Sequence, residues 1–266
     1  MTGDKSARRH APQRLAKMRT LRLQAACLTG RGRVRAENQD DCSIDAKRGI
    51  FVVADGVGGA AGGAVAAQAV VKVLPGLVSE RLAAQPKPTE EGIAEALKSA
   101  IADLGQKLRE QTANEPQLRG MSSTVVLALA RGKSVYVAHA GDSRAYLLEK
   151  GKLRQLTRDH SLVAVMLELG QITPEQARVH PHRSRITRCV GMEGIVVADV
   201  QHVSVKPGCR LLLCTDGLTG MVPDDEIGRI LKQAKSAKAA CRRLVDEANR
   251  AGGQDNITAL IVDLKR

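Results

Sequence analysis

The chain has 266 residues, of which 43% are hydrophobic and 26% are charged, a balance that is typical of one folded domain and excludes an intrinsically disordered protein. The formal net charge of +13 favours acidic partners such as phosphoproteins, anionic lipid surfaces or nucleic acid, without choosing among them. Aromatic residues make up only 1% of the chain and tryptophan is absent, so the stacking platforms of single-stranded nucleic-acid binders are missing and no nucleic-acid partner is expected.

Residues 1–20 differ in composition from the rest of the chain. They carry six basic side chains against one acidic one, and they lack the apolar run that an export signal needs. We expect a solvated, disordered basic extension there and one folded domain over residues 21–266.

The remaining chain predicts grouped strands and helices. Apolar runs and alternation indicate strands, and apolar residues at helical spacing indicate helices. Strands are expected at 21–29, 50–54, 123–130, 134–140, 144–150, 210–214 and 257–264, and helices at 64–74, 89–111 and about 224–250. Residues 159–191, rich in polar and turn-forming side chains, are expected to form a surface flap. Because strands and helices do not alternate steadily, the pattern favours an α+β fold with antiparallel sheets.

The six cysteines show neither CxxC nor metal-ligand spacing, and we expect them to be reduced, mostly buried side chains of a cytoplasmic protein. They are Cys27, Cys42, Cys189, Cys209, Cys214 and Cys241. No segment reaches the roughly eighteen uninterrupted apolar residues of a membrane span. The best candidate, residues 60–78, contains glycines, Lys72 and Pro75, and predicts a helix packed through small residues in a soluble protein.

Five aspartates recur in matching contexts, most of them just after apolar strands and beside glycines. They are Asp40, Asp55, Asp142, Asp216 and Asp255. The end of a strand fixes the backbone, so several strand ends can aim carboxylates at one point. Such carboxylates repel one another unless cations intervene, and oxygen ligands alone select Mg²⁺ or Mn²⁺. Each Asp-Gly pair alone is an ordinary turn, but the set, with Arg35 five residues before Asp40, favours a metal centre.

In motif order the chain resembles the metal-dependent protein phosphatases of the 2C type, the PPM family, in its bacterial subgroup. The resemblance runs from about residue 21 to the C-terminus through GRVRAENQD, FVVADGVGG, MSSTVV, VAHAGDSRAY, LTRDHSLV, ITPEQARVHPHRSRITRCVG, LLLCTDGLTGMV and GGQDNITALIV. It implies a four-layer αββα sandwich, in which two antiparallel β-sheets are flanked by helices. A binuclear metal centre is then expected at one edge of the sandwich.

The resemblance also implies the metal ligands. For two tightly bound Mn²⁺ or Mg²⁺ ions they are Asp55 as the bridging carboxylate, Gly56 through its carbonyl, Asp216 and Asp255. A third, weaker ion is held in bacterial relatives by residues that correspond to Asp142 and to Ser184 of the flap. Two sites are therefore expected at the strand ends, and a third between the strand ends and the flap.

Catalytic roles follow from the same resemblance. Asp40 looks like the acid that orients metal-bound water, and Arg35 looks like the residue that grips the substrate phosphate through charge-assisted bonds. Many eukaryotic members have a histidine, a proposed general acid, where this chain has Val57. The candidate proton donors are His160 and His180, although histidines without catalytic duty are more common.

The implied reaction is hydrolysis of phosphoserine and phosphothreonine in proteins by a metal-bridging water or hydroxide. The resemblance implies an enzyme that opposes a bacterial Ser/Thr kinase, and we expect a cytoplasmic monomer. Three alternatives stay open: an inactive scaffold with the same fold, a binder of nucleic acid or anionic surfaces, and a phosphatase of small metabolites. The complete carboxylate set counts against the first alternative, and the missing aromatic platforms count against the second.

Overall fold

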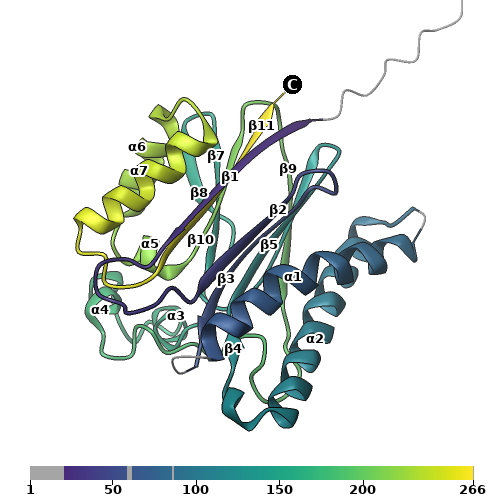
Figure 1. Ribbon diagram of the computed structural model, residues 1–266. Coiled ribbons are helices and arrows are strands. Elements are labelled where there is room, and N and C mark those ends of the chain that lie inside the picture. The colour runs from purple at the N-terminus through teal and green to yellow at the C-terminus, as the bar shows by residue number, and fades with distance from the viewer. Residues whose placement is uncertain (1–20, 59–61, 86, 266) are drawn as a thin grey trace, which may run out of the picture.

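Two antiparallel β-sheets form the centre of the structure. The computed structural model describes residues 21–58, 62–85 and 87–265, so the basic extension predicted at 1–20 lies outside the described residues. The sheets lie face to face, and helices cover their outer faces (Figure 1). This arrangement confirms the predicted αββα sandwich.

The first sheet has the antiparallel strand order β1-β11-β10-β7-β8. Its strands are β1 (Arg22–Gly30), β7 (Arg144–Glu149), β8 (Lys152–Gln155), β10 (Arg210–Cys214) and β11 (Ile257–Lys265). The second sheet has the antiparallel order β2-β3-β5-β6-β9, and the short β4 pairs with β3. Its strands are β2 (Asp40–Asp45), β3 (Ile50–Val57), β4 (Ser122–Ser123), β5 (Val125–Arg131), β6 (Ser134–Ala140) and β9 (Asp199–Ser204).

Each sheet is covered by its own pair of helices. The second sheet carries α1 and α2, and the first carries α6 and α7 (Figure 1). The helices are α1 (Gly62–Ala83), α2 (Glu90–Asn114), α3 (Leu162–Glu168), α4 (Pro174–Val179), α5 (Asp216–Thr219), α6 (Asp224–Gln233) and α7 (Ala237–Arg250), with a 3-10 turn η1 at Pro116–Leu118.

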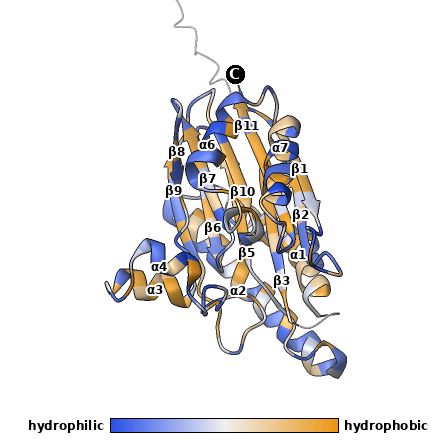
Figure 2. Cartoon of the chain, turned by 90° about the vertical axis from the view of Figure 1, so that its left-hand side faces the viewer, coloured by the Kyte–Doolittle hydropathy of each residue, from blue (hydrophilic) through white to orange (hydrophobic). Residues whose placement is uncertain are grey.

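Three hydrophobic clusters fill the spaces between these layers. One lies between α1, α2 and the second sheet, one between the two sheets, and one between the first sheet and α6 and α7. Strand β3 serves two of them, because Ile50 and Val52 face the helices whereas Phe51 and Val53 face the other sheet. Figure 2 shows the same distribution, with hydrophobic residues concentrated on the strands. The strand predicted at 50–54 is therefore buried on both faces.

Among the described helices, α1 is long and apolar enough to cross a membrane by length and composition. Its residues Ala66, Val70 and Leu74 are buried in the hydrophobic cluster between α1, α2 and the second sheet. The apolar face of α1 is thus accounted for by packing on β3.

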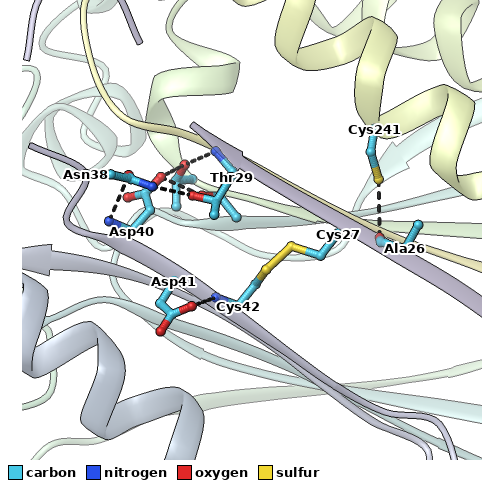
Figure 3. Close-up of a disulfide and its surroundings, with 10 residues drawn as sticks. Ala26, Cys27, Thr29, Asn38, Asp40, Asp41, Cys42 and Cys241 are labelled. Atoms are coloured by element: carbon cyan, nitrogen blue, oxygen red, sulfur yellow. Dashed lines mark hydrogen bonds between the residues drawn. A yellow bond between two sulfur atoms is a disulfide. The ribbon is translucent and has the colours of Figure 1, made fainter. Parts of the chain in front are cut away.

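The expectation that all six cysteines are reduced is wrong for two of them. Cys27 of β1 and Cys42 of β2 form a disulfide, with their Cα atoms 6.9 Å apart (Figure 3). β1 and β2 are edge strands of different sheets, so sheet packing brings together two cysteines that no sequence spacing connects. Free and buried, as predicted, are Cys189, Cys209, Cys214 and Cys241.

The region predicted as a flap holds α3 and α4. Its two ends are joined, because Ser161 and Ile186 form a β-bridge and the N–H of Leu162 donates to the carbonyl of Arg185 over 2.8 Å. Helix α3 is hydrophobic in Figure 2, although none of its residues is buried. The flap is thus anchored at its base while it exposes apolar surface.

Candidate metal centre

Two carboxylates of the predicted centre come from paired strands. Asp40 begins β2, Asp55 lies near the end of β3, and the antiparallel register places them opposite each other. The N–H of Asp55 donates to Oγ1 of Thr124 over 3.1 Å, and Oγ of Ser123 donates to the Asp55 carbonyl over 2.9 Å. Strand pairing therefore brings two like charges together and fixes the backbone of one of them.

Gly56 sits where β3 meets the start of α1. A Cβ at this position would lie 2.0 Å from the carbonyl oxygen of Gly63 and 2.8 Å from that of Gln39. Any side chain at position 56 would therefore push away the backbone of Gly63 or of Gln39, so only glycine fits here. The residue predicted to offer its carbonyl to a metal is thus fixed beside Asp55.

Asp40 lies in a cradle of hydroxyl groups. Its Oδ2 accepts hydrogen bonds from Oγ1 of Thr215 over 2.9 Å and from Oγ1 of Thr258 over 2.8 Å. Burial raises the pKa of this carboxyl to about 7, against the lowering effect of the two hydroxyls. Within the described part of the chain, its buried Oδ1 has no hydrogen-bond partner. A buried acceptor without a partner costs about 1–3 kcal/mol, so this oxygen fits a bound water or cation.

Asp216 and Asp255 enter the centre from the first sheet. Asp216 opens α5 after β10, from which only Thr215 separates it, and Asp255 precedes β11. A Cβ at Gly217 would lie 1.9 Å from the carbonyl oxygen of Asn256, so the two loops touch through their backbones. Nη2 of Arg35 donates to Oδ2 of Asp255 over 2.6 Å, and this bond chiefly raises the pKa of the half-exposed guanidinium.

Asn256 organises the loop that carries Arg35. Its Oδ1 accepts from the N–H of Gln39 over 2.8 Å. Its Nδ2 donates to the carbonyls of Arg31 and Glu37 over 3.0 and 2.8 Å. Asn256 thus holds the loop before β2 against the loop of Asp255.

A cavity of about 440 Å³ joins the strand ends to the flap. Its lining includes Asp142, Asp216 and Asp255 from the sheets and Ser184 from the flap. The structure therefore brings together the two residues predicted to hold a third ion. A second hollow of about 590 Å³, beside Arg109 at the end of α2, contains none of the five predicted aspartates.

The carboxylates perturb one another. Burial and then the charge of Asp40 raise the pKa of Asp55 well above its ordinary range. The pKa of Asp142 is likewise raised well above its ordinary range, first by burial and then by the charge of Asp216. The pKa of Asp216 is raised by burial and then by the charge of Asp255. Such repulsion is relieved by cations, and a set of carboxylate oxygens suits hard divalent ions. The residues present therefore fit Mn²⁺ or Mg²⁺.

Neither histidine predicted as a proton donor lines this cavity. His160 is buried, and its ring nitrogens contact the N–H of Gly141 and the carboxylate of Asp199. Nδ1 of His180, at the end of α4, accepts from the N–H of His182. These positions give no support to a proton-donor role, which stays a prediction.

The sequence profile described as Protein phosphatase 2C matches residues 29–260. The chain belongs to the protein phosphatase 2C family. It is 38% identical over 244 residues to the serine/threonine phosphatase stp of Listeria welshimeri, covering 91% of this chain and 96% of the relative. Its fold matches the crystal structure of the Mycobacterium tuberculosis serine/threonine phosphatase PstP with a TM-score of 0.82 and 36% identity, over 92% and 99% of the two chains.

A second solved relative bears on the metals. The catalytic domain of PstP in complex with two manganese ions is 33% identical, with a TM-score of 0.76 over 93% of this chain and 100% of that one. This member of the protein phosphatase 2C family is thus a metal-dependent protein serine/threonine phosphatase of bacterial type.

Sequence reasoning missed the hydroxyl groups that hold two of the aspartates of this phosphatase. Ser123 and Thr124 bind the backbone of Asp55, and Thr215 and Thr258 bind the carboxylate of Asp40. The available signal was position, because each hydroxyl residue lies within a quoted motif at the end of an apolar strand. Each such side chain satisfies a buried polar group beside the site.

Proposed function

We propose that this phosphatase removes phosphate from phosphoserine and phosphothreonine of proteins with two Mn²⁺ or Mg²⁺ ions, and that a third, weaker ion lies between Asp142 and Ser184. The ligands of the first two are Asp55, the carbonyl of Gly56, Asp216 and Asp255. One observation carries the proposal: buried carboxylates from both sheets converge on one point and raise one another's pKa. When bound, the ions would supply the activation of water for attack on phosphorus.

The chain's own residues bind and orient the reactants. Oδ1 of Asp40 has no partner among the described residues, which supports a role in holding a water. Arg35 uses Nη2 for Asp255, and the other donors of its guanidinium are suited to the oxygens of a substrate phosphate. Their charge-assisted bonds would stabilise the phosphoryl group as it is transferred.

The partners we propose are phosphorylated proteins and a bacterial Ser/Thr kinase whose action this enzyme opposes. Arg178 and Arg183 line the same cavity as the carboxylates and add positive charge to its flap wall. The net charge of +13 acts in the same direction, since it attracts phosphorylated segments. We further propose a cytoplasmic monomer.

The test compares hydrolysis of a phosphothreonine peptide with hydrolysis of small phosphorylated metabolites, using chelator-stripped protein replenished with Mn²⁺. We expect the peptide to be preferred, and Asp55→Ala to abolish turnover through loss of metal. The matched control is Asp103→Asn on α2. It removes the ion-pair partner of Arg81 of α1, far in sequence from the predicted ligands, and should retain activity. Preference for a metabolite, or near-normal turnover by Asp55→Ala, would contradict the proposal.

A further inference from the structure

His139 of β6, Asp199 of β9 and His160, which is among the first residues of the flap, form a compact cluster. The two imidazole rings stack with centroids 4.6 Å apart and an interplanar angle of 14°. Potential ligand atoms of the three residues lie within 4.8 Å of one another, a spacing that could hold a metal ion. Both histidines are buried, whereas about half of the Asp199 side chain is exposed.

The hydrogen bonds argue against a metal in this cluster. Nδ1 of His160 accepts from the N–H of Gly141 over 3.2 Å, so Nε2 carries the proton and donates to Oδ2 of Asp199 over 3.2 Å. Nε2 of His139 faces the carbonyl of Arg158 over 2.7 Å and must donate to it. Both Nε2 atoms are therefore protonated, and only one imidazole lone pair is left for an ion.

Gly141, the residue before Asp142, is hydrogen-bonded to His160 through both its N–H and its carbonyl. The N–H of Gly141 is bound by the His160 ring, and the Gly141 carbonyl accepts from the His160 N–H over 3.0 Å. Gly141 has φ +125°, and a Cβ there would lie 2.6 Å from Cβ of Thr124. No larger residue fits, so the position of Asp142 depends on how this glycine is bound.

His160 is also joined to the flap just after Ser184. Its carbonyl accepts from the N–H of Thr187 over 2.8 Å, one residue beyond the bridge between Ser161 and Ile186. Asp199, which binds the His160 ring, also accepts from Nη1 of Arg188 over 3.2 Å. One buried residue thus fixes the loop of Asp142 and the flap segment that follows Ser184.

We propose that His160 is a positioning residue that sets Asp142 against Ser184 for the third metal ion. The imidazole acts through the Gly141 peptide and touches neither substrate nor ion. This inference rests on the third ion of the proposed function. Groups that orient metal ligands typically change metal affinity about 10–100-fold when removed, so an effect of that order is expected on the weakest site.

Two substitutions separate the hydrogen bond from the rest of the ring. In His160→Asn, the amide oxygen can take the place of Nδ1 and accept from Gly141. In His160→Gln, the amide reaches the position of Nε2 and leaves the Gly141 N–H without its acceptor. The matched control is His202→Asn, because His202 also stacks on a ring, that of Tyr136, and also contacts a carboxylate, that of Glu90.

The experiment is calorimetric titration of Mn²⁺ into chelator-stripped protein, with thermal melting of each variant as a check of folding. We expect His160→Gln to weaken the third ion about tenfold or more while both tighter ions bind as in the wild type. His160→Asn and His202→Asn should keep all three affinities. A purely structural role would lower the melting temperature without this selective loss.

The inference is overturned if His160→Gln binds the third ion like the wild type, or if His160→Asn loses it equally. Should the His160 variants not fold, Asp199→Ala, at an exposed position, is the second test, and we expect a several-fold loss at the third site only. Unchanged binding in that variant overturns the inference as well. The titration uses no substrate, so a wild type that binds only two ions would instead refute the third site of the proposed function.

Discussion

The disulfide between β1 and β2 gives a stability prediction that can be worked from the structure. Cys27 and Cys42 are separated by 15 residues, and closing a loop of that length stabilises a protein by about 3 kcal/mol, mainly by restricting the unfolded chain. For a protein of this size the loss corresponds to a fall in melting temperature of roughly 6–12 °C. The double substitution of both cysteines by alanine should show this fall.

The assay is thermal and urea unfolding of the wild type and the double variant, with and without dithiothreitol. Reductant should lower the stability of the wild type to that of the double variant and leave the variant unchanged, so the variant is its own control. A wild type that melts at the same temperature in both buffers would refute the disulfide, since the four other cysteines are free and buried.

Three further predictions concern the carboxylate centre. Asp216→Asn should raise the melting temperature of the metal-free protein, because it removes one of several buried negative charges. The same variant should no longer be stabilised by Mn²⁺, and a variant that Mn²⁺ still stabilises would contradict this prediction. Arg35→Ala should raise KM for a phosphopeptide about 10–100-fold with a smaller change in kcat, as expected for loss of a charge-assisted bond, and an unchanged KM would exclude the phosphate contact. The raised pKa of Asp40, about 7 against an ordinary 3.8, means that its stabilising contribution to the metal-free protein is present below pH 3.8 and is lost as the pH rises through 7. The stability of the wild type relative to Asp40→Asn should therefore fall across that interval, and a rise would show that the carboxyl is not buried as described.

Much of the centre could be predicted because its parts are local in sequence. Asp55 and Asp216 come after continuously apolar runs of residues, and the glycine that follows each of them is needed because another backbone segment lies against it. An aspartate and a glycine at the end of an apolar run indicate a strand end whatever segments pack around it. The α+β class with antiparallel sheets and the grouping of the carboxylates could therefore be predicted from the sequence pattern, whereas the four-layer sandwich was implied by the resemblance to the protein phosphatase 2C family.

Other features depend on contacts between distant segments. Strand β2 has the polar sequence DDCSID, so no alternation predicted it, although it carries Asp40 and Cys42. Its edge position explains that composition, because only one neighbouring strand and one face need be matched. The disulfide and the threonine cradle of Asp40 arise where β2 meets the first sheet, and no spacing along the chain reveals that meeting.

The role that we propose for His160 could not be predicted from the sequence, for a related reason. Its motif suggested proximity to the centre, but only the fold shows that the ring faces Gly141 and Asp199 and not the cavity. Burial lowers the pKa of this imidazole, which favours the neutral ring that the two bonds require. Proximity in motif order could not distinguish a proton donor from a positioning residue.

The most direct test of the metal centre is a crystal structure of the Mn²⁺-soaked protein with anomalous diffraction recorded at the manganese absorption edge. We expect two strong anomalous peaks that share the carboxylate of Asp55, with Asp216 and Asp255 beside one of them. Peaks elsewhere, or none at these carboxylates, would contradict the account.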